Sequence, residues 1–181
     1  MVRRTENQEG TQDSALADDA LKNGWAQTVA DMRAMAADRE EQGFETLAIV
    51  SGDTSPVDPK GGETDRWGLS YLIPGDEVDQ FTEVHAQGEF TDTGVYQQTQ
   101  NGHVFMVEEN IDYDNELIVF VAGTFMMIDA TALVRTALDR GRMYSHVRTL
   151  DRTIVGQFEH DDPAAYFPEP DSYYQLTPDF G

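Results

Sequence analysis

Residues 94–109, GVYQQTQNGHVFMVEE, predict a β-hairpin near the middle of the chain. The Asn-Gly pair at 101–102 suits a two-residue hairpin turn, because both of its central positions take positive φ angles that these two residues tolerate. A turn at this pair places Tyr96 opposite Val107. Because alternate side chains of a strand point to the same side, Tyr96, Phe105 and Val107 are expected to share a buried face.

The sequence pattern on either side of this hairpin predicts an α+β fold, a mostly antiparallel sheet of about seven strands covered by three helices. Asp151-Arg152 forms the turn of a second hairpin. The strands are expected at 46–50, 67–73, 94–100, 103–109, 117–122, 143–150 and 153–160, and the helices begin near residues 14, 76 and 129. This order leaves open a β-α-β-β unit that occurs twice. Residues 52–66, rich in Pro and Gly, are predicted to form a long loop, a kind of segment that is often functional.

Three segments follow from composition. Residues 1–13 are polar and aperiodic, which predicts a disordered N-terminal segment, and residues 14–162 form a single domain. Residues 163–181 form a tail rich in Pro and aromatic residues, which is unusual for a segment that stays in solvent. We expect this tail to dock on its own domain, or to reach a second subunit in a homodimer or another protein. Its candidate partner-binding residues are Tyr166, Phe167, Tyr173, Tyr174 and Phe180.

The charge of the chain is strongly negative: 34 Asp and Glu stand against 12 Lys and Arg, which gives −22. Such a surface repels itself in dilute buffer, but at about 1 M salt the Debye length falls to about 3 Å and most of the repulsion is screened. The composition is therefore typical of a protein from the cytosol of a halophile. Nucleic acid is not an expected partner, since binding by phosphate contacts weakens steeply with salt and this surface repels phosphate.

Several classes of site are excluded or disfavoured. The chain has no Cys, so disulfides and thiolate chemistry are absent. No apolar run reaches the length of a membrane helix and residues 1–13 lack the core of a signal peptide, so we expect a cytoplasmic protein without a membrane partner. The four His residues lack the spacing of a metal motif, and the sequence predicts no metal site, no cofactor and no identifiable catalytic residue.

Basic residues gather at 135–152, where five Arg stand against two Asp. Strand periodicity places alternate residues of 142–148 on one face, and the hairpin brings a residue of the following strand opposite them. Arginine forks and a histidine that titrates near neutrality suit a small anion or a carboxylate. The alternative is that these arginines pair with the protein's own carboxylates. The candidate ligand-binding residues are Arg142, Tyr144, His146, Arg148 and Gln157.

The segments RMYSHVRTLDRTIVGQFEHDDPAAYF (142–167) and WAQTVADMRAMAADREEQGF (25–44) resemble an uncharacterised family of small acidic haloarchaeal proteins, over most of residues 22–167. The resemblance supports the halophile interpretation and implies no catalytic residue. Our leading hypothesis is a non-enzymatic binding or regulatory module of unknown ligand or partner. The alternative is a small enzyme acting on an anionic metabolite, with Arg142, His146 and Arg148 in its pocket and a loop carboxylate as base.

Overall fold

The structure is a computed structural model that describes residues 3–59 and 66–174, with side chains described from residue 17 onward. Within these residues the chain forms four α-helices, eight strands and three short 3-10 turns. The helices are α1 (Arg3–Glu41), α2 (Val78–Gln87), α3 (Thr131–Arg140) and α4 (Pro170–Tyr174). The strands are β1 (Glu45–Val50), β2 (Thr54–Val57), β3 (Gly68–Leu72), β4 (Asp92–Gln100), β5 (His103–Asp112), β6 (Leu117–Met126), β7 (Met143–Arg148) and β8 (Ile154–His160).

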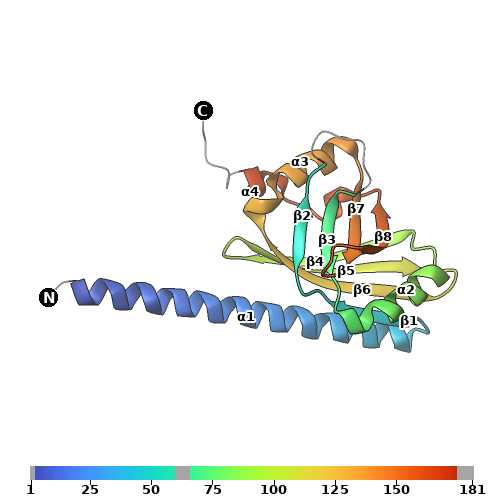
Figure 1. Cartoon of the computed structure of the whole chain (residues 1–181), viewed down its shortest axis with the longest axis horizontal. Helices are drawn as coiled ribbons and strands as arrows, with labels where there is room; N and C mark the ends of the chain where they lie inside the picture. Colours follow the sequence, from blue (N-terminus) through green and yellow to red (C-terminus); the bar gives the residue numbers. More distant parts are fainter. Residues whose placement is uncertain (1–2, 60–65, 175–181) are drawn as a thin grey trace.

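The strands form two four-stranded sheets, so the α+β class is confirmed but the single, mostly antiparallel sheet is wrong. The first sheet has the order β1-β6-β5-β4 and the second has the order β2-β3-β7-β8. Each is mixed, because β1 runs parallel to β6 and β3 runs parallel to β7. The predicted β-α-β-β units do not stay within one sheet: β3 belongs to the second sheet and the hairpin that follows α2 belongs to the first. In Figure 1 the strands of the second sheet cross those of the first.

The main core lies between the two sheets. Ile49, Met106 and Val121 of the first sheet and Leu69 and Val147 of the second belong to one buried cluster. The opposite face of the first sheet is covered by α1, whose Met32 and Ala36 pack in a second cluster with side chains of β5 and β6. Figure 1 shows α1 running along this sheet and continuing past it toward the N-terminus.

The predicted hairpin at Asn101-Gly102 is confirmed, with Gln100 opposite His103 and Tyr96 opposite Val107. Both turn residues have positive φ angles, as this turn requires. Phe105 and Val107 are buried, but Tyr96 is 48% exposed. The expected fully buried face is therefore wrong at Tyr96, because β4 is the edge strand of its sheet.

Two further elements differ from the sequence-based expectation. The predicted loop 52–66 contains β2, an edge strand of the second sheet with Pro56 inside it. An edge strand tolerates Pro because one side of its backbone makes no hydrogen bonds to another strand. Pro56 is typical of a loop, and the strand was therefore not predicted. Helix α1 begins at Arg3, so it includes residues 3–13 that were expected to be disordered.

The aromatic tail packs on its own domain in the described residues. Tyr166, Phe167 and Tyr173 are buried members of the main core. The Tyr166 carbonyl accepts a hydrogen bond of 2.8 Å from Gln97 Nε2 on β4, which ties the tail to the edge of the first sheet. Tyr174 lies under the Arg135 guanidinium, 4.8 Å from ring centroid to Cζ, and Phe180 lies outside the described residues.

Candidate functional site

The outer face of the second sheet carries a row of polar side chains, one from each strand. Ser55 of β2 pairs with Ser70 of β3, Ser70 pairs with His146 of β7, and His146 pairs with Gln157 of β8. The last pairing was predicted from the second hairpin. Paired residues of neighbouring strands point to the same face of a sheet, so the four side chains lie side by side.

The predicted hairpin register fails at its turn end. Arg148 pairs with Ile154, where Val155 was expected, because an irregularity lies between Val147 and Arg148. An extra residue of this kind bends a strand and redirects the next side chain. The residue skipped in the pairing is Val155 of β8, so the bulge lies on β8 opposite Arg148.

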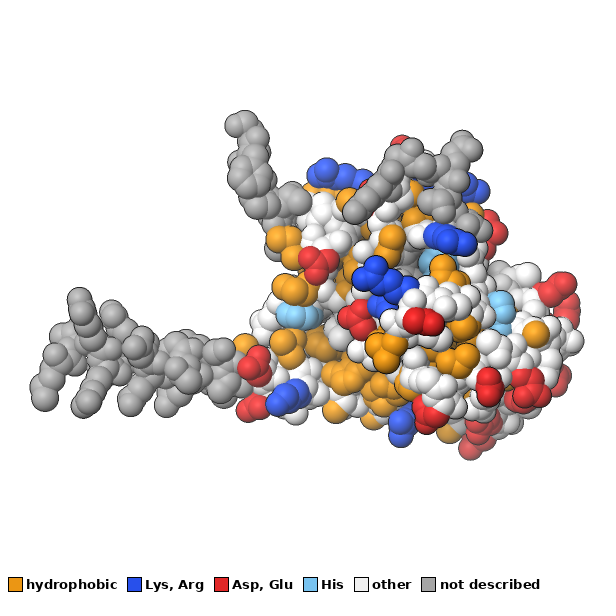
Figure 2. Space-filling model, in the orientation of Figure 1, with side chains coloured by type: hydrophobic (Ala, Val, Ile, Leu, Met, Phe, Trp, Pro, Cys, Tyr) orange, Lys and Arg blue, Asp and Glu red, His pale blue; other side chains and the backbone are white. Residues whose placement is uncertain are grey.

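A hollow of about 580 Å³ lies over this row. Three arginines, a histidine and two serines line it together with an acidic residue and three apolar ones. They are Asp53, Ser55, Val57, Arg66, Ser70, His146, Arg148, Leu150, Arg152 and Ile154. Leu150 is 85% exposed, so the hollow has an open rim. In Figure 2 basic side chains gather over the second sheet and the helix beside it, whereas acidic side chains crowd the right-hand and lower edges of the body.

Arg148 is the best-fixed cation of the hollow. Its Nε donates to Ser70 Oγ over 2.8 Å, and its Nη2 donates to Asp53 Oδ2, also over 2.8 Å. The same Asp53 oxygen accepts a 2.8 Å hydrogen bond from Ser55 Oγ. The Arg148 side chain is 18% exposed while that of Asp53 is 57% exposed. The arginine is thus held against the sheet wall by a carboxylate that remains open to solvent.

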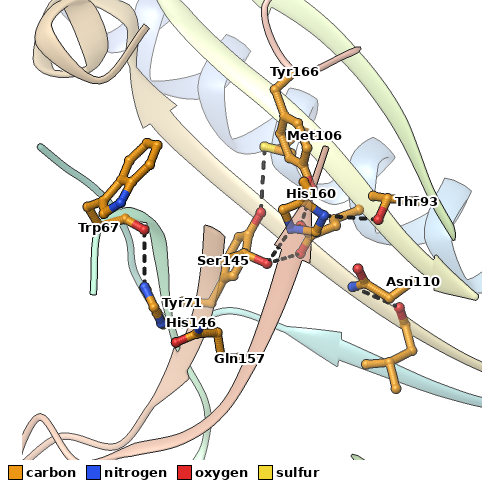
Figure 3. Close-up of polar contacts among 12 residues, drawn as sticks. Trp67, Tyr71, Thr93, Met106, Asn110, Ser145, His146, Gln157, His160 and Tyr166 are labelled. Carbon is orange, nitrogen blue, oxygen red and sulfur yellow. Dashed lines mark hydrogen bonds and ion pairs between the residues drawn. The ribbon is translucent and has the colours of Figure 1, made fainter. Parts of the chain in front are cut away.

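His146 is buried in the wall of the hollow. Its Nε2 lies 3.1 Å from the Trp67 carbonyl oxygen. Because a carbonyl oxygen only accepts, Nε2 must carry a proton and donate it there. Figure 3 shows His146 pointing to Trp67 on one side of β7, while its chain neighbour Ser145 points to His160 on the other.

A second hollow of about 500 Å³ adjoins the first. It is lined by Gln157 and Thr153, and it shares Arg66, Arg152 and Ile154 with the first hollow. The two hollows therefore meet at two arginines and an apolar side chain.

The structure brings together three of the five predicted ligand-binding residues, His146, Arg148 and Gln157. Arg142 and Tyr144 line neither hollow: the Arg142 guanidinium lies 5.9 Å from the centroid of the Tyr144 ring, and that ring packs edge-on against Trp67. Alternation along β7 was correct, but these two residues lie at the end of the strand where Trp67 covers the face.

The sequence analysis missed Asp53, Ser70 and Arg66 as site residues. They come from β3 and the segments around it, and the parallel pairing of β3 with β7 brings them to the hairpin. Arg152 was predicted as a turn residue within the basic segment 135–152 but not as a ligand-binding residue. Its place in the cluster of basic residues was the one signal that could have identified it.

A separate polar cluster lies inside the main core, around the fully buried Glu108 of β5. His160 Nε2 lies 2.8 Å from Glu108 Oε1, and Ser145 Oγ donates to Glu108 Oε2 over 3.2 Å. The Tyr166 hydroxyl also donates to Glu108 Oε1. His160 Nδ1 lies 2.9 Å from Thr93 Oγ1, so both ring nitrogens have a partner (Figure 3).

Burial alone would raise the pKa of the Glu108 carboxyl. The positive charge of His160 and hydrogen bonds from His160, Tyr166 and Ser145 outweigh burial and hold this pKa below its ordinary value. Burial first, and then the nearby Glu108 charge, raise the pKa of the Tyr166 hydroxyl well above its ordinary value, so this hydroxyl stays a donor. The cluster is a satisfied ionic network in the core.

The Ser145, His160 and Glu108 side chains do not form a nucleophile relay. In such a relay the histidine receives the serine proton on one ring nitrogen and the acid holds the other nitrogen. Here Ser145 and Glu108 both meet Nε2, at 2.8 Å each, and Ser145 is completely buried. This geometry supports a structural role.

No group of three or more His, Asp or Glu side chains suited to a metal ion occurs within the described residues. Among the helices of the described part, none has the length and apolar character needed to cross a membrane.

Comparison with known proteins gives a family but no activity. No curated protein and no solved structure matches the sequence. A family of unknown function (DUF7529) matches residues 11–168, which include both sheets and the arginine-lined hollows. The expected membership in an uncharacterised family is confirmed, and the chain belongs to this family of unknown function, DUF7529.

Proposed function

We propose that the protein is a non-enzymatic binding module for a small organic anion, which occupies the first hollow. The observation that carries the proposal is the gathering of Arg66, Arg148 and Arg152 around one hollow in a chain of charge −22. Arginine forks bind carboxylate and phosphate groups in two-point geometry. Arg148 Nε donates a hydrogen bond to Ser70 Oγ, so the guanidinium group is oriented before a ligand binds.

Binding is favoured over catalysis because Asp53 and the Nε2 atom of His146 already make hydrogen bonds within the protein. The one carboxylate among the described lining residues, Asp53, accepts hydrogen bonds from Arg148 and Ser55. His146 donates through Nε2 to a backbone carbonyl, which fixes its ring in the wall.

We further propose that the protein works in the cytoplasm of a halophile, where salt screens its acidic surface. Screening also weakens the attraction between the arginines and an anion. Apolar contacts are not weakened in this way, and some salts strengthen them. Val57, Leu150 and Ile154 line the hollow, so the proposal includes an apolar group on the ligand.

The proposal is tested by titrating the protein with benzoate and phenyl phosphate in molar KCl and following heat release. The Arg148→Gln variant is expected to lose about tenfold or more in affinity, since a charge-assisted hydrogen bond contributes about 1.5–3 kcal/mol. Arg142→Gln is the matched control, because Arg142 directly precedes β7, at the opposite end of that strand from Arg148, and lines neither hollow. Failure of both probes to bind the unaltered protein, or equal loss in the two variants, would contradict the proposal.

A further inference from the structure

The two adjoining hollows are continuous in their lining. Arg66, Arg152 and Ile154 line both of them, and the volumes of about 580 and 500 Å³ each fall in the range usual for small-molecule sites. A ligand confined to the first hollow would leave the second one unused. The shared residues are two cations and one apolar side chain, so the junction can contact both an acid group and an apolar chain of a ligand that spans the two hollows.

Arg152 is placed at the junction by an unusual turn. Its φ angle is +68°, in the left-handed region that favours Gly and Asn over Arg. The turn is closed by its backbone hydrogen bond to Thr149 and by Asp151, whose Oδ1 accepts hydrogen bonds from Thr149 Oγ1 and Thr153 N. The turn itself therefore gains nothing from an arginine side chain at this position.

The Arg152 guanidinium also has no partner among the residues that the structure describes. Across the part of the chain that the structure describes, it makes no hydrogen bond, ion pair or ring contact. This contrasts with Arg148, which is held by Asp53, and with Arg140, which lies over the Trp67 ring. An exposed cation without a partner, in a chain so rich in carboxylates, is available for an external anion.

The charge of the joined hollows defines the ligand further. Among the described residues that line them are three arginines and one aspartate, so basic side chains predominate there. Arg148 is partly neutralised by Asp53, whereas Arg152 at the junction of the hollows is left to balance a second negative group. One acid group fits beside Arg148 in the first hollow, and the other fits the second hollow near Thr153 and Gln157.

We infer that the ligand is an elongated organic dianion whose two acid groups lie in the two hollows, joined by an apolar chain that passes Ile154, with Arg152 as the residue that selects for the second acid group. This inference rests on the proposed function. The two hollows would recognise a ligand with one acid group at each end, so a ligand with a single acid group would occupy only part of the site.

The test compares dicarboxylates from succinate to suberate with monocarboxylates of equal chain length, such as adipate with hexanoate, by calorimetric titration in molar KCl. We expect the best dicarboxylate to bind about tenfold or more tightly than its monocarboxylate. Arg152→Gly should remove that difference, because adipate is expected to lose about tenfold or more in affinity while hexanoate loses less. Glycine suits the left-handed turn, so this variant should melt no lower than the unaltered protein.

The possible outcomes separate the two claims. If adipate and hexanoate bind equally, the dianion inference is wrong while the binding module stands. If neither binds, both are wrong. Hexyl phosphate, which carries two charges on one group, tests whether the two charges must be separated. If it binds as tightly as the best dicarboxylate, and if Arg152→Gly does not weaken its binding, the charges need not be separated and the inference is overturned.

Discussion

His160 Nε2 lies 2.8 Å from Glu108 Oε1, and this contact joins β8 of the second sheet to β5 of the first inside the core. Both side chains are almost completely buried. Taking charges out of water is unfavourable, and their attraction offsets this only when hydrogen bonds satisfy the remaining atoms. Ser145 and Tyr166 supply those bonds to Glu108. The pair therefore fixes how the two sheets face each other.

Glu108→Gln is expected to lower the free energy of unfolding by about 3 to 5 kcal/mol, because it removes one partner of a buried ion pair and places an amide donor among existing donors. Urea unfolding at constant salt measures the loss. Glu159→Gln is the control, since Glu159 is an exposed neighbour of His160 in sequence. Equal stability of the two variants would show that the buried pair contributes little.

Stability should fall in acid through the same carboxylate. The pKa of Glu108 in the folded protein lies below its ordinary value of 4.5, so its stabilising contribution is present above that value. The contribution is lost as the pH falls from about 4.5 toward the lowered pKa. Urea unfolding between pH 6 and 3 should therefore show a steeper decline for the unaltered protein than for Glu108→Gln. Parallel curves would refute this assignment.

Gly68→Ala should disrupt the parallel pair of β3 and β7. An added Cβ would lie 1.8 Å from the Tyr144 carbonyl oxygen, and the φ angle of Gly68 is +120°. We expect a loss of about 3 kcal/mol or more, or failure to fold, in thermal unfolding. Gly75→Ala is the matched control, because nothing lies within 4 Å of its added Cβ. Similar melting of the two variants would contradict the close approach.

Asp53→Asn should strengthen anion binding. The amide no longer neutralises Arg148, while its oxygen still accepts from Ser55, so benzoate affinity is expected to rise about threefold to tenfold. Calorimetric titration measures the change. Glu41→Gln, at the end of α1 on the far side of the first sheet, controls for the loss of one negative charge. Weaker binding by Asp53→Asn would instead mean that Asp53 contacts the ligand favourably.

The melting temperature should rise from millimolar to molar KCl, because salt screens the repulsion of a surface with charge −22. Sucrose at equal osmolality is the control, since it favours compact states by exclusion from the surface but does not screen charge. A melting temperature that is independent of KCl, or an equal rise in sucrose, would require another explanation for the acidic composition.

The parts of the fold that could be predicted are those encoded by neighbouring residues. Asn101 and Gly102 specify their hairpin by themselves, and Gly141 ends α3 with a φ angle of +66° and a bond from its N–H to the Ala137 carbonyl. The division into two sheets was not predictable in this way. It depends on the parallel pairing of β1 with β6 and of β3 with β7, and no local pattern specifies a partner so distant in the sequence.

The site follows the same rule. His146, Arg148 and Gln157 belong to one hairpin, and their common face could be inferred from alternation. Ser70 and Arg66 enter through the distant strand β3, so they were missed. The burial of Glu108 could not be predicted either. Glu108 follows an apolar run, which is typical of the polar end of a strand, whereas β5 is buried on both faces.

The two parallel pairs also determine when the chain can fold. Glu45 of β1 pairs with Leu117, and Leu69 of β3 pairs with Ser145, so each early strand must wait during synthesis for a partner made much later. The hairpins β4–β5 and β7–β8 can form as soon as they leave the ribosome, but neither sheet closes until the distant strand arrives. Pairings of this kind slow folding and leave apolar strand edges exposed in the nascent chain. The interval before β7 emerges, when β3 still lacks this partner strand, is thus the period in which a newly made molecule is most exposed to aggregation.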